Sequence, residues 1–476
     1  MDLKFGTSGL RGPSADLLDG GAASFSSAFV RHLLTTGCIE IGGRMFIGRD
    51  LRESSPAIAV QCMKALAQAG MVPVDCGPLP TPALALYAGA NRGAAIMVTG
   101  SHIPANRNGL KFYRPDGEID KADEARIIEL ALEPDAGEHD ALPKNSGIDE
   151  AVAAWALYRD RCLSILPAGA LSGLRVGVYQ HSSVARDFVV DLLSTYGAEV
   201  LALGRSETFI AIDTEAIGNE TGTLLRKWVL EHGLDAVVST DADGDRPLII
   251  DDAGSQIRGD TIGLITALAV GADCIVTPVT TNSGIDRASG VRTIRTRVGS
   301  PYVIQALLEA SRKSDGIVTG FEANGGFILV TQVRLGPMTL EALPTRDSIL
   351  PILTLLGQNG ASLSRHVRTL NLPVCMSDRL VGRLGMTHHE IIAALAADRT
   401  NIECFMRGLG EVAHVDWTDG PRITLHDGSV VHLRPSGNAP EMRCYAEAAT
   451  HDAAVRLLRH TLARLRERTI PEGAWT

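Results

Sequence analysis

Long apolar runs, blocks of like charge and low-complexity tracts are all missing from this 476-residue sequence. No apolar run approaches the roughly 20 residues that a helix needs to span a bilayer, so we expect no membrane contact. The 45 basic and 55 acidic residues give a formal net charge of -10 without a long block of either sign, which argues against nucleic acid and anionic membranes as partners. An anionic substrate would therefore depend on locally placed arginines and a metal.

Paired cysteines and a secretion signal are absent as well. The 8 cysteines are scattered and none stands in a Cys-x-x-Cys pair, which favours reduced thiols in the cytosol. The N-terminus shows no basic stretch followed by an apolar one. We therefore expect a cytoplasmic protein.

The sequence does contain a repeated alternation of strand and helix patterns. A chain of this length is too long for one core and should divide into units of roughly 100–150 residues. The alternation indicates three α/β domains with largely parallel sheets and covering helices, at 1–148, 149–252 and 253–366. The last domain, 367–476, has a hairpin pattern over 422–431 around Asp-Gly, which indicates an α+β domain with an antiparallel sheet.

A serine loop follows a buried strand pattern in the first domain. The apolar run 94–98 leads into Thr-Gly-Ser-His, and strand ends are where α/β proteins expose their chemistry. Ser101 offers a hydroxyl nucleophile, His102 a donor and Lys111 a fixed positive charge in this loop. Taken alone, an ordinary polar loop would be the better explanation, but three further segments point the same way.

Three aspartates follow a second buried strand pattern. Asp241, Asp243 and Asp245 alternate along the chain, and alternate side chains of an extended segment point the same way. Three carboxylates so close repel one another unless a cation lies between them. Hard oxygen ligands favour magnesium or calcium, and a site completed by a substrate phosphate favours Mg2+. The alternative is an Asx-rich turn at the strand end.

Two glycine-containing loops complete the set. Glu322 and Asn324 offer a carboxylate and an amide that suit the hydroxyls of a sugar, with a bulged hairpin as the alternative. Near the C-terminus, glycine and small polar residues can surround an oxyanion while arginines supply bidentate charge. A plain hairpin is the alternative there. The residues of this phosphate cradle would be Arg434, Ser436, Gly437, Asn438 and Arg443.

These four loops, in this order, resemble those of the α-D-phosphohexomutase family, which includes phosphomannomutases, phosphoglucomutases and phosphoglucosamine mutases. The opening segment 5–12, Phe-Gly-Thr-Ser-Gly-Leu-Arg-Gly, is similar to the family's N-terminal motif. The resemblance therefore covers essentially the whole chain. It implies three similar α/β domains and a C-terminal α+β domain around a central cleft. It also implies an intramolecular phosphotransferase that acts on a sugar phosphate, as a monomer or homodimer.

The resemblance implies a role for each loop. Ser101 would carry a phosphoryl group and share Mg2+ with Asp241, Asp243 and Asp245. The existing phosphate of the sugar would dock on the cradle around Arg434. Transfer from the serine would give a hexose 1,6-bisphosphate, the intermediate and activator, and return of its other phosphate would leave the isomeric monophosphate.

Four residues are the candidates for charge stabilisation or proton transfer near this serine: Arg11, His102, Lys111 and Arg246. We favour Lys111 as the base, because neighbouring cations would favour its neutral amine.

The sequence departs from the family pattern in the loops that contact the sugar. Relatives usually have Glu-x-Ser-Gly-His where this chain has Glu-Ala-Asn-Gly-Gly from Glu322, so Gly326 replaces the histidine often credited with proton transfer. Gly299 and Ser300 occupy the place where relatives discriminate between sugars, without the charged or imidazole residue of many relatives.

We expect a phosphomannomutase first, because the altered loops look less like the uniform glucosamine branch. Phosphoglucomutase and phosphoglucosamine mutase follow. A phosphatase that works through phosphoserine would release inorganic phosphate without isomerisation. A silent sugar-phosphate-binding protein is a further alternative, motivated by the missing histidine.

Overall fold

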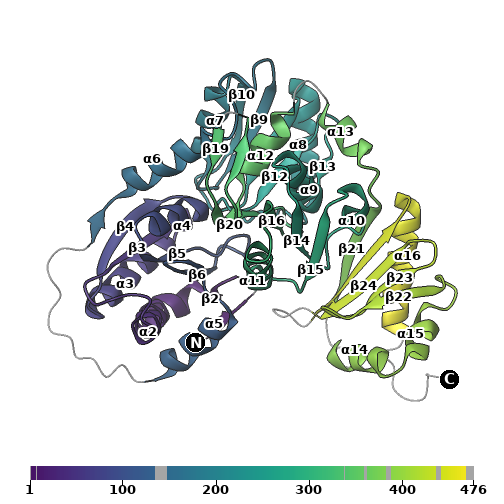
Figure 1. Ribbon diagram of the computed structural model, residues 1–476, viewed down its shortest axis with the longest axis horizontal. Coiled ribbons are helices and arrows are strands. Elements are labelled where there is room, and N and C mark those ends of the chain that lie inside the picture. The colour runs from purple at the N-terminus through teal and green to yellow at the C-terminus, as the bar shows by residue number, and fades with distance from the viewer. Residues whose placement is uncertain are drawn as a thin grey trace.

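The computed structural model describes residues 2–6, 8–133, 147–336, 338–358, 362–381, 388–435 and 441–467. Within them the chain forms four main sheets, one after another along the sequence, and a separate two-stranded sheet. The four sheets and their helices define four domains that follow an arch, from the N-terminal domain at the left of Figure 1 to the C-terminal domain at the right. No helix in these ranges is both long enough and apolar enough to cross a membrane.

The first domain is built on an eight-stranded sheet in the order β1-β2-β6-β5-β3-β4-β8, with β7 paired to β6. Its central strand β3 has parallel neighbours on both sides. Met45 and Ile47 of this strand pack in one core with helix α3, whereas Phe46 packs in another core with α4. A sheet covered on both faces explains why its parallel strands are continuous apolar runs. The strands are β1 Lys4–Phe5, β2 Leu10–Pro13, β3 Arg44–Arg49, β4 Val72–Pro78, β5 Ala94–Val98, β6 Arg107–Arg114, β7 Gly117–Glu118 and β8 Ile148–Asp149, and the longer helices are α2 Ala22–Thr35, α3 Ser55–Gln68, α4 Thr81–Ala90 and α5 Lys121–Leu132.

The second and third domains repeat the central strand order of the first: β4-β3-β5-β6 corresponds to β10-β9-β11-β12 and to β15-β14-β16-β17. In each unit the first three strands are parallel and the fourth is antiparallel. The three predicted polar loops each join the third strand to the fourth. The prediction of three similar α/β domains is confirmed.

The second domain consists of α6 Ala151–Cys162, β9 Arg175–His181, α7 Arg186–Thr195, β10 Glu199–Arg205, α8 Asn219–His232, β11 Ala236–Thr240, β12 Pro247–Ile250 and β13 Gln256–Ile257. The third consists of α9 Gly259–Ala269, β14 Cys274–Pro278, α10 Ile285–Ala288, β15 Arg292–Thr296, α11 Ser300–Ser311, β16 Val318–Phe321, β17 Phe327–Leu329, β18 Val333–Leu335, β19 Met338–Leu340, β20 Leu343–Asp347, α12 Ile349–Leu356 and α13 Leu363–Thr369.

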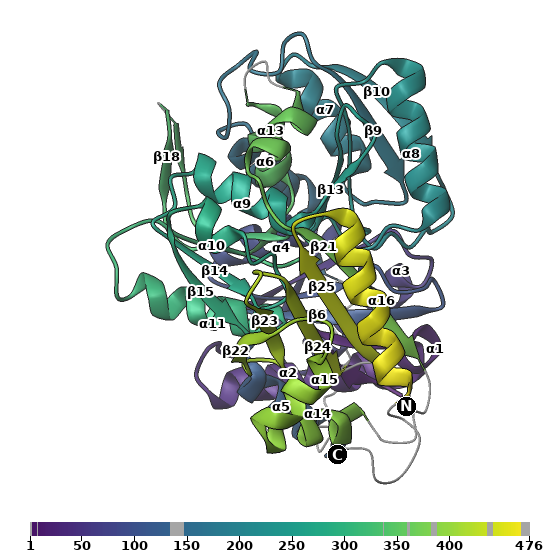
Figure 2. The same ribbon diagram turned by 90° about the vertical axis from the view of Figure 1, so that its right-hand side faces the viewer.

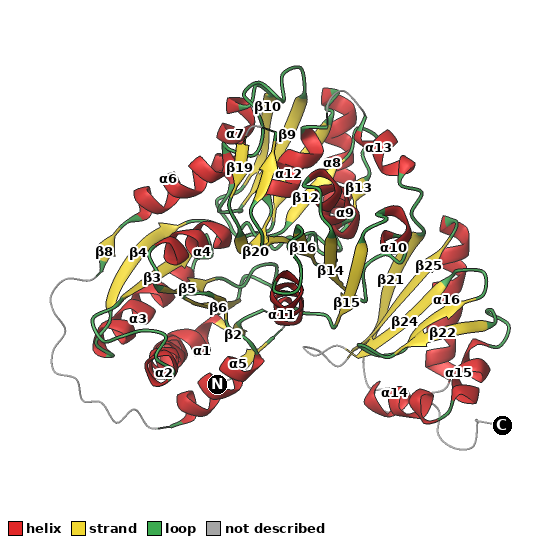
Figure 3. Ribbon diagram, viewed as in Figure 1, coloured by secondary structure: helices red, strands yellow, loops and turns green. Residues whose placement is uncertain are grey.

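The C-terminal domain has an antiparallel sheet in the order β21-β25-β24-β23-β22. Figure 3 shows this sheet with its helices, and in Figure 2 helix α16 runs across β21 and β25. The hairpin predicted around Asp-Gly and the α+β class are confirmed. The elements are β21 Val374–Val381, α14 His388–Ala397, α15 Arg399–Met406, β22 Val412–Asp416, β23 Arg422–Leu425, β24 Val430–Pro435, β25 Glu441–Ala448 and α16 His451–Glu467.

The hydrophobic cores distinguish the C-terminal domain from the other three. One continuous cluster joins the first three domains, with Phe46, Val238 and Phe321 among its members. The C-terminal domain has a cluster of its own, which includes Leu433 and Leu458. Polar contacts link it to the third domain, so the first three domains form one packed body to which the fourth is attached.

Candidate active site

The loops after β5, β11 and β16 converge where the three domains meet. Ser101 of the first domain donates a hydrogen bond of 2.6 Å from Oγ to Oδ2 of Asp241 in the second. Arg346 of the third domain bonds to Asp245 of the second, with Nε 3.0 Å from Oδ2. The carboxyl ends of parallel strands are the usual location of α/β active sites, which explains why loops distant in sequence meet here.

Ser101 is 1% exposed and has a left-handed backbone with φ of 53°. A non-glycine residue in this region is uncommon and is retained where the surroundings determine it, often at functional sites. Arg52 provides those surroundings: its guanidinium donates to four backbone carbonyls of the loop, those of Ser101, Ile103, Pro104 and Arg107.

Arg52 is itself held from two sides. Its Nε lies 3.2 Å from Oδ2 of Asp50, and both side chains are buried. The ring of Phe209, from the second domain, stacks on its guanidinium with 3.9 Å from Cζ to the ring centroid. This clamp was not predicted from the sequence. The charged residues Asp50 and Arg52, directly after the end of β3, were the available signal.

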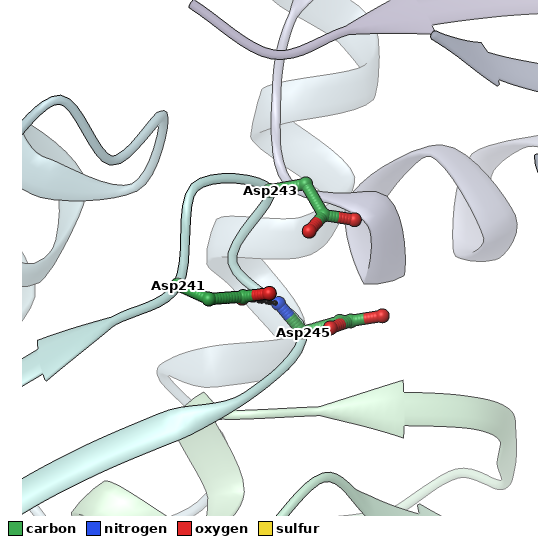
Figure 4. Close-up of side chains that lie close together, drawn as sticks. All are labelled: Asp241, Asp243 and Asp245. Carbon is green, nitrogen blue, oxygen red and sulfur yellow. Dashed lines mark hydrogen bonds between the residues drawn. The ribbon is translucent and has the colours of Figure 1, made fainter. Parts of the chain in front are cut away.

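Asp241, Asp243 and Asp245 are fully buried, and one oxygen of each lies within 4.8 Å of the others. Figure 4 shows the three side chains extending from one loop. Burial and the charges of Asp243 and Asp245 raise the pKa of Asp241 well above its ordinary value. Burial alone would raise the pKa of Asp245 too, but the charges of Arg346 and Lys111 outweigh it and lower that pKa.

The cluster fits a hard divalent cation. The Oδ1 atoms of Asp243 and Asp245 are buried and accept no hydrogen bond from any described residue. Buried carboxylate oxygens without a hydrogen bond are costly, and a cation that accepts oxygen ligands would satisfy them. The convergence of the three aspartates that the sequence predicts is therefore present, and the identity of the metal remains a prediction.

The surroundings of Lys111 differ from those expected. Its Nζ lies 2.5 Å from Oδ2 of Asp243 and 2.6 Å from Oδ2 of Asp245. We expected cations next to Lys111, but the two hydrogen-bond partners of its ammonium group are carboxylates. The reason is that Lys111 lies on β6 of the first domain and its long side chain reaches the aspartate loop of the second domain. The local sequence does not reveal this contact. A role for Lys111 as base stays a prediction.

Arg11 and Arg246 form the cationic side of the site, and His102 is bonded to Arg246. Arg246 Nη1 donates to His102 Nδ1 at 2.8 Å, so the imidazole accepts on this nitrogen. Burial and the charges of Arg246 and Arg11 lower the pKa of His102 to about 2. Burial and the charge of Arg246 lower the pKa of Arg11 to about 10. His102 is therefore neutral over the physiological pH range.

The predicted sugar loop is ordered by internal bonds. The Oδ1 of Asn324 accepts from the backbone N–H of Gly326 at 3.0 Å, and its Nδ2 lies 3.5 Å from Oε2 of Glu322. Gly299 has a φ of 130° and precedes α11. Ser300 begins that helix and donates to Glu118 of the first domain at 3.2 Å. In this conformation the hydroxyl of Ser300 is thus paired within the protein.

The two arginines of the predicted phosphate cradle are register partners on β24 and β25, so their side chains leave the same face of the sheet. Arg434 Nε donates to Oδ2 of Asp419 at 2.8 Å. Arg443 lines a cavity of about 320 Å³ between the second and C-terminal domains, together with Glu215 and Arg379. The other cradle residues, Ser436, Gly437 and Asn438, lie outside the described residues.

Arg346 is a second residue that the sequence analysis missed. It is 1% exposed and lies on β20, and its guanidinium contacts residues from all three packed domains: Ser8, Asp245 and Glu322. An arginine within a strand of buried residues was the signal that could have identified it.

Fold and site together define a four-domain α/β enzyme with a buried serine next to an acidic metal-type cluster. Four domain families match the chain, and they are described as phosphoglucomutase/phosphomannomutase α/β/α domains I, II and III and the C-terminal domain, at residues 2–137, 157–254, 258–370 and 391–465. The chain belongs to this family, the α-D-phosphohexomutases, as the sequence resemblance indicated. It is a phosphomannomutase-like mutase.

Individual relatives support this assignment. A phosphomannomutase of Sinorhizobium fredii is 49% identical over 470 residues, which cover 98% of this chain and 99% of the relative. A phosphomannomutase of Salmonella muenchen is 40% identical over 477 residues, covering 98% and 96%. The fold is similar to that of a phosphoglucomutase/phosphomannomutase family protein from Burkholderia thailandensis, with a TM-score of 0.75, 20% identity and 98% of each chain covered. The open form of a Paramecium phosphoglucomutase gives a TM-score of 0.71 at 16% identity, covering 97% of this chain and 94% of that one.

Proposed function

We propose that this mutase interconverts mannose 1-phosphate and mannose 6-phosphate through a phosphoserine at Ser101 and a bisphosphorylated sugar. The observation that carries the proposal is the bond of 2.6 Å between Ser101 and Asp241, beside two buried carboxylate oxygens that lack hydrogen-bond partners among the described residues. Mannose is preferred because the relatives at 49% and 40% identity are named phosphomannomutases. Glucose and glucosamine phosphates are the alternative substrates.

Asp241, Asp243 and Asp245, together with the phosphorylated Ser101, would hold Mg2+. When bound there, Mg2+ would neutralise the charge of the phosphoryl group and of the carboxylates. Arg246 bonds to His102, the chain neighbour of Ser101, and its Nε lies 4.0 Å from Oδ2 of Asp241, so it offers a fixed positive charge close to the transferring group. Most of the rate enhancement would then come from positioning and charge neutralisation.

The sugar phosphate would bind in the central cleft that the family resemblance implies. Its existing phosphate would lie on Arg434 and Arg443 and on the cradle residues Ser436, Gly437 and Asn438, and its hydroxyls would meet Glu322 and Asn324, with Gly299 and Ser300 nearby. The far hydroxyl then faces phosphorylated Ser101. These cradle and sugar contacts are proposals that rest on the sequence motifs.

In the first transfer, the far sugar oxygen bonds to phosphorus as the bond between phosphorus and Ser101 Oγ breaks. The proton of the sugar hydroxyl leaves to a base, for which we keep the sequence-based candidate Lys111, whose Nζ lies beside the aspartate cluster, and the departing Oγ of Ser101 takes up one proton to restore its hydroxyl. The resulting hexose 1,6-bisphosphate turns over in the cleft and presents its other phosphate to the serine. The reverse transfer regenerates the phosphoserine and leaves the isomeric monophosphate.

We also propose the domain division 1–148, 149–252, 253–366 and 367–476. It is supported by the sheets, whose strands fall within these ranges with two exceptions: β8 lies across the first boundary, and β13 pairs with the sheet of the second domain although its residues follow 252. The cytoplasmic location and the association state, monomer or homodimer, stay predictions.

Phosphorus NMR of the purified protein tests the proposed function. The sample contains Mg2+, trace hexose 1,6-bisphosphate and, in parallel, mannose 1-phosphate, glucose 1-phosphate or glucosamine 1-phosphate. We expect conversion to the 6-phosphate, fastest with mannose. Growth of inorganic phosphate alone would indicate a phosphatase, and no change at all would indicate a silent binding protein; either would overturn the proposal.

A further inference from the structure

Gly326 stands where relatives carry the histidine of the sugar loop. The side chain of Arg346 fills the space that a side chain at position 326 would need. A Cβ atom added to Gly326 would lie 2.7 Å from Cδ, 2.9 Å from Cγ and 3.2 Å from Cβ of Arg346. These three are the nearest atoms, and all belong to the near part of the arginine stem, which cannot swing away without moving the whole side chain. A side chain at 326 and Arg346 in its present position therefore exclude each other.

The guanidinium of Arg346 is fixed by bonds in three directions. It donates to Asp245 through Nε at 3.0 Å, to Oε2 of Glu322 through Nη1 at 3.0 Å, and to the hydroxyl of Ser8 through Nη2 at 2.8 Å. Nη2 also lies 2.9 Å from Oδ2 of Asp245. One planar fork thus connects a proposed metal ligand, a proposed sugar ligand and the N-terminal motif.

This arginine stays charged. Burial would lower its pKa, but the carboxylates of Asp245, Glu118 and Glu322 raise the pKa of Arg346 well above its ordinary value. A guanidinium that never loses its proton cannot serve as a base or an acid. Whatever Arg346 contributes, it contributes as a positive charge and as a set of fixed donors, unlike the histidine it displaces.

We propose that Arg346 is a positioning residue of the mutase reaction, which holds Asp245 and Glu322 in one fixed geometry so that the cation and the sugar are aligned on Ser101. The inference rests on the proposed function, since it assigns to Asp245 and Glu322 the metal and sugar contacts given above. In this chain the permanently charged Arg346, between the proposed metal and sugar sites, occupies the space that a histidine at position 326 would need.

Arg346→Lys tests the proposal because lysine keeps the positive charge but lacks the planar set of guanidinium donors. A single ammonium group cannot bond Asp245, Glu322 and Ser8 in the same plane. We expect KM for the hexose phosphate to rise and Mn2+ affinity of the sugar-free protein, measured by electron paramagnetic resonance, to fall, each by about 10- to 100-fold. The matched control is Arg161→Lys, a buried arginine of α6 that donates to the backbone carbonyl of Glu341, and both quantities should stay at the wild-type value.

Wild-type KM and wild-type Mn2+ affinity in Arg346→Lys would overturn the positioning role. Failure of that variant to fold would overturn it too, because Arg346 would then be required for folding itself. Absence of mutase activity in the wild-type protein would instead refute the proposed function. The Mn2+ measurement needs no turnover, so it tests the positioning role of Arg346 even in that case.

A double-mutant cycle tests the competition for space. Gly326→Ala should lower kcat/KM by about 10-fold in the wild type because it displaces the arginine stem, and should cost little in an Arg346→Ala background, where the space is open. Additive costs would contradict the exclusion between the two side chains. If Arg346→Ala does not fold, the lysine variant still decides the proposal.

Discussion

At the scale of single residues, the chemistry of the site depends on buried charges that balance one another. Asp241, Asp243 and Asp245 face Lys111, Arg246 and Arg346 in a volume that water hardly reaches. Burying one carboxylate without a partner would be costly, so a cluster of three is stable only with fixed cations around it. Two of its oxygens still lack a hydrogen bond among the described residues, which leaves a place for a metal.

Removing one carboxylate should weaken the metal and the rate together. For the wild type, Mg2+ at about 100 times its Kd would stabilise the fold by about 2.7 kcal/mol and raise Tm. In Asp243→Asn we expect a much smaller rise and an activity about 10- to 100-fold lower. Differential scanning calorimetry across an Mg2+ titration, with exposed Asp160→Asn as control, measures the first effect. An equal Mg2+-dependent rise in wild type and Asp243→Asn would show that the cluster is not the metal site.

A buried histidine should make the protein sensitive to acid. His432 is 2% exposed, its Nε2 donates to the carbonyl of Asp419 at 2.8 Å, and burial lowers its pKa to about 4. The unfolded chain takes up a proton near pH 6.5, so stability is complete above that pH and is lost as the pH falls toward 4, by about 2 kcal/mol at pH 5.

Substitution of this histidine isolates its contribution. His432→Gln keeps an N–H donor and removes the titration, so its Tm should fall less between pH 7 and pH 5 than that of the wild type. The same fall in both proteins would mean that other groups cause the acid sensitivity.

Residues whose role is local could be predicted from sequence, and residues whose role depends on distant partners could not. Ser101 and Asp241 lie in polar, glycine-containing loops directly after apolar strands, so their position at a strand end could be predicted. Arg52 and Arg346 act through partners up to 338 residues away in the chain, as with Arg346 and Ser8. Nothing in the neighbouring sequence specifies such pairs.

At the scale of elements, the close approach of β2 to β6 positions the N-terminal motif against the serine loop. Gly109 on β6 lies opposite Arg11 on β2. A Cβ atom there would be 2.3 Å from the carbonyl oxygen of Leu10 and 2.9 Å from that of Thr99. Because both contacts are backbone, the strands themselves would have to separate.

Gly109→Ala should therefore cost about 1–3 kcal/mol of stability and reduce activity by moving Arg11. Gly89→Ala in α4, where nothing lies within 4 Å of the added atom, is the control; it should not destabilise the protein, because alanine favours the helix more than glycine does, and its activity should stay at the wild-type value. Thermal melts and kcat/KM of the two variants decide the matter; wild-type values in Gly109→Ala would contradict the packing argument.

The elements themselves were largely predictable. Apolar runs such as β5 and β11 fill the middle of sheets covered on both faces, and this burial produces the signal that sequence analysis uses. What the pattern did not contain is the shared strand order of the three sheets, because pairing is set by contacts between strands and not by any one of them.

At the scale of the whole molecule, the C-terminal domain is attached to the packed body by polar contacts and by its first residues, of which Val367, Leu370 and Leu372 pack against the shared core. Asp419 accepts from the backbone N–H of Val298 at 3.1 Å and from Arg434 at 2.8 Å, so one carboxylate holds both the third domain and a proposed phosphate ligand. The C-terminal core is separate from the shared core. The geometry of this attachment was not readable from sequence, since it depends on how finished domains meet.

Asp419→Ala should loosen this attachment. Without ligand, we expect small-angle X-ray scattering to give a larger radius of gyration for the variant than for the wild type. With hexose 1,6-bisphosphate bound between the packed body and the C-terminal domain, we expect similar radii for the two proteins. Exposed Glu411→Ala in the same domain is the control. An unchanged radius in Asp419→Ala would show that this carboxylate does not restrain the domain.

The central claim is that Ser101 carries the phosphoryl group that reaches the sugar. The protein is charged with radiolabelled hexose bisphosphate, freed of ligand and mixed with unlabelled mannose 1-phosphate in Mg2+, and the label is followed through a single turnover. The account predicts that the label maps to Ser101, passes to the sugar phosphate, and is absent from a folded Ser101→Ala variant, whose turnover falls by at least about 10³-fold. Label that stays on the protein, appears only as inorganic phosphate, or is carried equally by Ser101→Ala would contradict it.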